Sequence, residues 1–519
     1  MEANVQRVGL FLVIIIGVIA ALFIGRSIAF ESYFPVILLA LFAIGVIYLS
    51  GGSKYTFHML LFAMFLDASF KPGFNIASGE QFALICGMVI LITCWRPAPE
   101  VQKPQVLAHW SLSLVKTFLS IWLGYVILHA VFHFLYFPSE GLKNIIKSYG
   151  STFFPYLFAL YFLNRPSAMV IPRNYSRMLF VIMLAALCIA LMMRVYQTHF
   201  GAMLESFDPG DVGMAGPLMI GPIFFVENVY ALRGIAPGGV LAGVALLVSR
   251  YKGFQNDIMR LVALSLILIG ITGCLYSGGR ASIVIAAGYT FIVLVLRRKI
   301  SWLFVGVVAT VIAIAFANLF SDWVNRSAPM QLARTLQWVL IEKDDSSSKG
   351  IEDSGRWRSE LRRKAFEEWK STPKNLWFGQ GFQGISSSDY AQAGYSAGGN
   401  FTGVSEDFGH YISIKRVATH NMFTDVLVGY GLVGAIFYYS LLLALMSLIY
   451  HIYFWLPPDS EHKEVALLSA AAIWGNSILG NWAGTFLYAI VFTYLVILIS
   501  ALYQHPPKVM ANALPAPER

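Results

Sequence analysis

The stretch from Ala281 to Phe320 reads ASIVIAAGYTFIVLVLRRKISWLFVGVVATVIAIAFANLF, and it decides the fold class. Two apolar runs flank the basic triplet Arg297-Arg298-Lys299, and each is close to the roughly 20 residues with which a helix crosses the hydrocarbon of a bilayer. This pattern indicates a helical hairpin that spans a membrane twice and keeps its basic turn on the cytoplasmic side.

The rest of the chain has the same apolar character. Of its 519 residues, 57% are hydrophobic and only 13% are charged, and the mean hydropathy is +0.65. These values lie well outside the range of soluble domains. We therefore predict an all-α polytopic membrane protein with about 12 to 14 transmembrane helices, because about fourteen apolar segments approach the length of a span. Two of them, 55–70 and 465–480, are short enough to be re-entrant.

The formal net charge of +9 does not indicate a nucleic-acid partner. The basic residues stand at the ends of apolar runs, where membrane lipid with anionic head groups accounts for them. The four cysteines all fall within apolar runs, so no disulfide framework is expected.

Orientation follows from the basic residues of the short connections, which are retained on the cytoplasmic side. Placing Arg297-Arg298-Lys299 inside also places inside, by alternation, Arg7, Arg96, Lys103, Arg165, Arg173, Arg177, Arg250, Lys252 and Arg260. The same alternation puts 197–234, 277–280 and 321–419 outside. We therefore expect an N-terminal transmembrane bundle (1–320), a long periplasmic or extracytoplasmic loop (321–419), and C-terminal transmembrane helices with a cytoplasmic tail (420–519).

Two arginines stand on or near the outer face, against the usual charge bias, and each lies beside glycine at the start of a span. Arg280 follows Gly278 and Gly279, and Arg233 precedes Gly234. Glycine lets the backbone approach a ligand closely, and a guanidinium presents donors that match phosphate oxygens. Both arginines are therefore candidates for binding a diphosphate. The alternative for each is a helix cap, or a side chain that snorkels to lipid head groups.

The polar tract 321–419 is about a hundred residues long, which is too long for a simple connector. Apolar residues recur at a spacing of four and predict an amphipathic helix that ends before Pro373: Trp357, Leu361, Ala365 and Trp369. Arg356 stands at the start of this helix, where anions are favoured, and is a weaker phosphate candidate than the outer arginines. Residues 375–382 then predict a turn. The segment 386–409 suits a mobile lid, a sugar-binding surface or a disordered segment.

His420 lies where the loop gives way to the next apolar run. An imidazole accepts a proton near neutral pH, so His420 is a candidate general base, although a structural role is commoner for a lone interfacial histidine. His129 and His133 have a spacing that can bind metal. No nearby cysteine or carboxylate completes such a site, so we expect packing or hydrogen bonding there.

Taken together, these motifs resemble those of the O-antigen ligase and polymerase superfamily. The shared order runs from Arg233-Gly234, through Ser277 to Arg280 and Gly355-Arg356-Trp357-Arg358, to a Trp-Phe-Gly-x-Gly turn, His420-Asn421 and the glycine element 429–434. The resemblance covers 231–450, approximately. Two departures stand out: the family often has Ser-Arg-Gly where this chain has 277–280, and 236–239 replaces its usual Asn-Pro region.

The resemblance implies a GT-C-like glycosyltransferase architecture in a bacterial inner membrane, with its active site facing the periplasm. It further implies inverting glycosyl transfer without a cofactor or metal ion, from a glycan carried on undecaprenyl diphosphate. Arg233 and Arg280, with Arg356, would bind the diphosphate and stabilise the leaving charge. His420 would orient or deprotonate the acceptor hydroxyl.

The acceptor separates the members of this superfamily. A polymerase extends another lipid-linked glycan, whereas a ligase transfers the glycan to lipid A core. The long loop slightly favours a polymerase, and transfer to a protein hydroxyl is a third alternative. A transporter or lipid-linked glycan flippase is the alternative of another class, and for it Asp67 would be the main mid-span acid.

Overall fold

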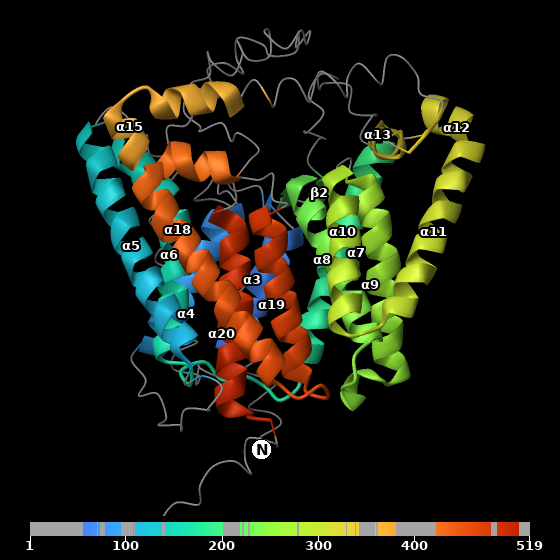
Figure 1. The fold of residues 1–519 in the computed structure, drawn as a ribbon, viewed down its shortest axis with the longest axis horizontal. Coiled ribbons are helices and arrows are strands. Elements are labelled where there is room, and N and C mark those ends of the chain that lie inside the picture. Colours follow the sequence, from blue (N-terminus) through green and yellow to red (C-terminus); the bar gives the residue numbers. More distant parts are fainter. Residues whose placement is uncertain are drawn as a thin grey trace, which may run out of the picture.

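The structure is a computed structural model. It describes residues 55–69, 71–72, 78–94, 107, 109–136, 141–200, 218–220, 223–226, 229–277, 280–328, 330–337, 339–341, 359, 362–379, 422–478 and 485–507. Most of these residues are helical, and the long helices stand side by side (Figure 1).

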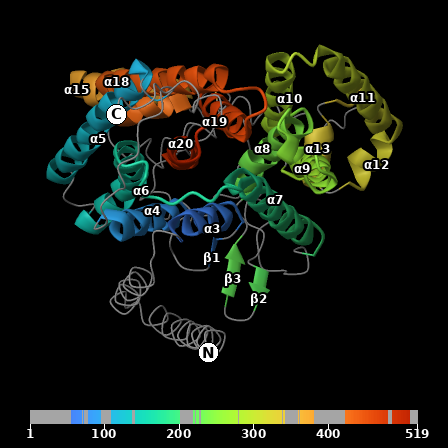
Figure 2. The same ribbon diagram turned by 90° about the horizontal axis from the view of Figure 1, so that it is seen from below.

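The helices fall into two neighbouring groups (Figure 2). The first group comprises α3 (Thr56–Ser69), α4 (Ser78–Cys94), α5 (Trp110–Tyr136), α6 (Gly141–Asn164), α15 (Pro373–Phe378), α18 (Met422–Trp455), α19 (Glu461–Ile478) and α20 (Thr485–Gln504). The second comprises α7 (Tyr175–Phe200), α8 (Val229–Leu247), α9 (Asp257–Tyr276), α10 (Arg280–Leu296), α11 (Ile300–Leu319), α12 (Ser321–Arg326) and α13 (Met330–Leu336).

Five helices in the described part of the chain are long and apolar enough to cross a membrane. Their candidate spans are Trp110–Phe132, Tyr175–Met192, Asp257–Tyr276, Ile300–Leu319 and Phe423–Trp455. The predicted class of helical membrane protein is therefore confirmed, while the number of 12 to 14 spans stays a prediction. The quoted hairpin is present as α10 and α11, with Arg298 in a left-handed conformation (φ 55°) at its turn.

The surface of α11 shows what surrounds these helices. No side chain of α11, which the structure describes in full, is buried, although the helix has a mean hydropathy of 2.5. Large apolar residues such as Phe304 and Leu319 are largely exposed. An apolar helix of this kind is stable only against lipid or another apolar partner, in accordance with a membrane protein.

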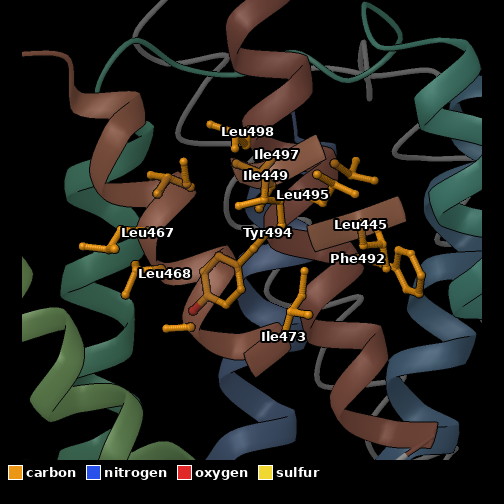
Figure 3. Close-up of a cluster of buried hydrophobic side chains, with 14 of the residues drawn as sticks. Leu445, Ile449, Leu467, Leu468, Ile473, Phe492, Tyr494, Leu495, Ile497 and Leu498 are labelled. Atoms are coloured by element: carbon orange, nitrogen blue, oxygen red, sulfur yellow. The ribbon is translucent and has the colours of Figure 1, made fainter. Parts of the chain in front are cut away.

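Side chains from α18, α19 and α20 form a dry interior at the centre of the first group. Leu445 of α18 lies beside Phe492 of α20, and Ile449 lies beside Leu495, while α19 contributes Leu467 to the same cluster (Figure 3). Since α5 packs against α18 and α6 packs against α20, the C-terminal helices are part of the same bundle as the N-terminal ones.

The structure departs from the all-α expectation in one small sheet. Strands β1 (Lys71–Pro72), β3 (Ile223–Val226) and β2 (Leu218–Ile220) pair antiparallel in the order β1-β3-β2. Phe225 faces both Pro72 and Leu218 in the register. Strands β2 and β3 are apolar runs of three and four residues, which are too short to stand out in a sequence rich in apolar runs.

The described connections with basic residues, at 165–177, 249–260 and 297–299, gather at one end of the bundle. Arg165 donates from Nη1 to the carbonyl of Cys94 (3.3 Å), which joins the ends of α6 and α4. A buried ion pair between Arg297 and Glu464 joins the end of α10 to the start of α19. Ser249, which follows α8, also hydrogen-bonds to Glu464. We refer to this end as the basic end, and to the other as the loop end.

Candidate active site

The backbone places the two outer arginines at the loop end, on neighbouring helices. The connections between α8, α9 and α10 are short, so these helices alternate in direction, and α8 packs against both of the others. Arg233 lies in the second turn of α8, and Arg280 is the first residue of α10. Since α10 ends at the basic end, both arginines stand at the opposite end. Their side chains lie outside the described residues.

The position of Arg233 differs from the expectation that it opens a span. The helix already begins at Val229, because the run Val229-Tyr230-Ala231-Leu232 continues the apolar pattern ahead of the arginine. Pro237 then falls inside α8 rather than near its start. Arg233 is thus carried by helical backbone.

The turn that carries Arg280 is braced on both sides. Ser277 donates from Oγ to the carbonyl of Cys274 (2.7 Å), and its Oγ lies at hydrogen-bonding distance from Oγ of Ser282 (3.3 Å). Both serines are buried. Because these bonds join the end of α9 to the first turn of α10, they fix the backbone on which Arg280 is mounted.

Arg194 is a third cation at this end, and sequence reasoning missed it. It lies near the end of α7, where it is buried, and its Nε donates to the carbonyl of Tyr276 (3.2 Å) at the end of α9. The sequence signal that could have identified it is its position in the apolar run 178–200. The alternation of spans places the end of this run outside, on the same side as Arg280. A buried guanidinium therefore lies beside the start of the 277–280 turn.

The other two predicted site residues lie outside the described residues. Arg356 precedes the described part of the loop helix. His420 lies two residues before Met422, where α18 begins. Since α18 ends at Trp455, shortly before Glu464 at the basic end, its start lies at the loop end. The structure therefore brings Arg233, Arg280 and the start of α18 to the same end, and it does not test the distances between the functional groups.

The helix that follows His420 has a sharp kink at Gly431. This residue has φ 66° and ψ −172° inside α18, so the segment 422–430 takes a different direction from the rest of the helix. Tyr125 of α5 donates from its hydroxyl to the carbonyl of Tyr430 (2.6 Å), the residue directly before the kink. The direction of the segment next to His420 is thus set by α5.

The described part of the loop packs into this kink. Residues 362–370 are helical, and Ala365 is buried while Trp369 is half-buried, in accordance with the predicted amphipathic helix ending before Pro373. The predicted turn at 375–382 needs correction, because 373–378 form the helix α15. Thr372 caps it by accepting from the backbone N–H of Asn375 (3.1 Å).

His129 fixes the end of α15. Its Nε2–H donates to the carbonyl of Phe378 (2.7 Å), and this hydrogen bond agrees with the expected role for His129. The side chain of His133 lies outside the described residues, as does that of Asp67 in α3, on which the transport alternative rests. Among the described residues no group of three or more His, Cys, Asp or Glu is placed to hold a metal ion.

These features define the class of protein as an integral membrane protein built from helices. Residues 264–439 match the family model described as O-antigen ligase. The predicted resemblance is thereby confirmed over these residues, which include Arg280, Arg356 and His420 but not Arg233. Among curated proteins, none is similar enough to the chain to count as a relative.

Proposed function

We propose that this protein is a membrane glycosyltransferase of bacterial surface polysaccharide biosynthesis. It transfers a glycan from undecaprenyl diphosphate to an acceptor sugar hydroxyl at the periplasmic face of the inner membrane. The observation that carries the proposal is the O-antigen ligase family match over 264–439, combined with the common position of Arg233, Arg280 and the start of α18 at the loop end.

The chemistry follows from the residue types. His420 accepts the proton of the acceptor hydroxyl, whose oxygen attacks the anomeric carbon from the face opposite the diphosphate. The bond from that carbon to the diphosphate oxygen breaks, undecaprenyl diphosphate leaves, and the anomeric configuration is inverted. Arg233, Arg280 and Arg356 bind the diphosphate and stabilise the charge that develops on it, which cations do best in a site shielded from water. No metal ion is required.

Arg194 contributes to this arrangement through its contact with the end of α9. Because its guanidinium is buried against the end of α9, its charge acts in a medium of low dielectric constant. Its hydrogen bond to Tyr276 holds the end of α9 next to the 277–280 turn. We therefore assign it a positioning role.

The acceptor decides between the two members of the family. We favour a polymerase, which adds a glycan to another lipid-linked repeat, because 321–419 offers a long surface to a growing polymer. The alternative is a ligase that transfers the glycan to lipid A core. In neither case does the donor chemistry change.

Deletion of the gene separates the two reactions. Loss of a polymerase leaves single repeats on undecaprenyl diphosphate and on the cell surface, whereas loss of a ligase leaves long chains on undecaprenyl diphosphate. Gel analysis of lipid-linked and surface glycans distinguishes these outcomes. Wild-type glycans in both fractions of the deletion strain would refute the proposed function.

A further inference from the structure

The end of α15 is fixed beside the apolar surface of α5. Its last residue, Phe378, accepts a hydrogen bond from His129 of α5. Exposed apolar residues continue along α5 past His129, through Phe132 to Leu135 in its last turn. The backbone of Phe378 therefore lies beside a part of α5 that presents an apolar surface to its surroundings.

Two large aromatic side chains face outward at this position. Trp377 is 48% exposed and Phe378 is 53% exposed. Their exposure does not come from loose packing of the backbone, because Gly379 directly follows them and lies against Gly431 of α18. The backbone is held tightly against the bundle while the two rings point away from it.

The neighbouring surface of α5 is apolar and continuous with the lipid-facing surface of its span. Leu128 and Phe132, on either side of His129 in the sequence, are largely exposed, and so is Leu135 in the last turn of α5. Trp377 and Phe378 extend this surface. Tryptophan is favoured at such a position because its ring is apolar while its N–H stays near water and head groups.

The charges on this part of the loop suit a lipid surface. Lys370 and Lys374, just before the two aromatic residues, are exposed. Residues 362–378 contain Arg362, Arg363, Lys364, Lys370 and Lys374 against Glu367 and Glu368 only. Basic residues beside interfacial aromatic residues favour contact with the phosphate groups of phospholipids.

From these observations we propose that α15 is a membrane-surface anchor. Trp377 and Phe378 insert into the head-group region of the bilayer leaflet at the loop end, and Lys374 contacts lipid phosphate. The occupant of this surface is bilayer phospholipid. The anchor fixes the loop at the depth where a lipid-linked diphosphate would lie. This purpose rests on the proposed function, whereas the contact of α15 with lipid does not.

The anchor is tested with spin labels on the full-length protein. The four native cysteines are first replaced by alanine: Cys86, Cys94, Cys188 and Cys274. A nitroxide label is then attached at one new cysteine per protein, Trp377→Cys, Phe378→Cys or Glu367→Cys. Each labelled protein is placed in nanodiscs of phosphatidylcholine and phosphatidylglycerol. Glu367 is the matched control, because it lies on the adjoining helix 362–370 and its side chain is 60% exposed. Collision rates with oxygen, which partitions into lipid, and with a water-soluble nickel chelate report the surroundings of each label.

We expect the labels at 377 and 378 to collide several-fold more often with oxygen than with nickel, and the label at 367 to show the reverse. Nickel access at all three positions would overturn the proposal in favour of an aqueous surface. Protection of 377 and 378 from both reagents would overturn it in favour of a protein partner, such as a second copy. If Phe378→Cys folds poorly, Trp377→Cys alone gives the same decision. No glycosyl transfer is measured, so failure of the anchor is distinct from failure of the proposed function.

Discussion

The backbones of Gly379 and Gly431 are in direct contact where the outer loop meets α18. A Cβ atom at Gly379 would lie 2.5 Å from the backbone nitrogen of Gly431, and a Cβ at Gly431 would lie 2.4 Å from the backbone nitrogen of Phe378. Both glycines have positive φ, 72° and 66°. The contact explains why a glycine follows Trp377-Phe378 and another lies in 429–434, two elements of the motif pattern that are far apart in the chain.

Replacement of either glycine therefore destabilises the protein. Gly379→Ala and Gly431→Ala are each expected to cost more than the roughly 1–2 kcal/mol of a left-handed alanine, because backbone atoms block the new methyl group. The measurement is the thermal unfolding midpoint in detergent. Gly288→Ala in α10 is the control, since nothing lies within 4 Å of its Cβ position. Equal midpoints for Gly379→Ala and Gly288→Ala would contradict the contact.

Two hydrogen bonds from α5 hold the same junction. Tyr125→Phe and His129→Phe leave the carbonyls of Tyr430 and Phe378 without these donors, at an expected cost of about 1–3 kcal/mol each. Both variants are expected to expose the outer loop to limited proteolysis several-fold faster than the native protein. Ser120→Ala removes an exposed, local hydrogen bond of the same helix and serves as the control. Unchanged cleavage rates in both α5 variants would show that these bonds do not dock the loop.

At the basic end, the ion pair between Arg297 and Glu464 is buried on both sides. Glu464→Leu is expected to cost about 3–5 kcal/mol, because it leaves the guanidinium buried without its partner. The double variant Arg297→Met/Glu464→Leu is expected to recover most of the loss, as measured by unfolding midpoints. Arg363→Gln, which breaks the exposed pair with Glu367, is the control and costs less than about 1 kcal/mol. A double variant no more stable than Glu464→Leu would refute the account.

Because the imidazole of His462 is buried, we expect the stability of the protein to depend on pH. Burial lowers the pKa of its imidazole from 6.5 to about 4, and the ring is held by Tyr175 (2.6 Å) and the carbonyl of His505 (2.9 Å). The unfolded chain then binds more protons than the folded one between these two pKa values, so stability falls as pH falls from about 6.5 to 4, by roughly 3 kcal/mol. His462→Gln is expected to flatten this slope in thermal unfolding. His58→Gln, at an exposed position on α3, should leave the slope as it is.

Features that depend on a single segment of the sequence could be predicted, whereas contacts between distant segments could not. Apolar runs and the triplet at 297–299 were enough for the membrane class and for the grouping of the basic connections, because burial in lipid and charge bias act on single segments. The contacts between Gly379 and Gly431, between Tyr125 and Tyr430, and between Arg297 and Glu464 join residues far apart in the chain. No local sequence pattern predicts such pairs. Arg194 was overlooked for the same reason, since its partner Tyr276 is on another helix.

The roles of Arg280 and His420 are the central claim, and glycosyl transfer by purified variants tests it most directly. Equal amounts of native protein, His420→Ala and Arg280→Ala are incubated with a glycan on undecaprenyl diphosphate and a lipid-linked acceptor, and the rate of product formation is measured. Lys252→Ala, at an exposed position between α8 and α9 at the basic end, is the control for handling. We expect losses of about 100-fold or more for both site variants, the usual effect of removing a general base or a group that stabilises the leaving charge. Rates within a factor of two of the native rate for His420→Ala and Arg280→Ala would contradict the account.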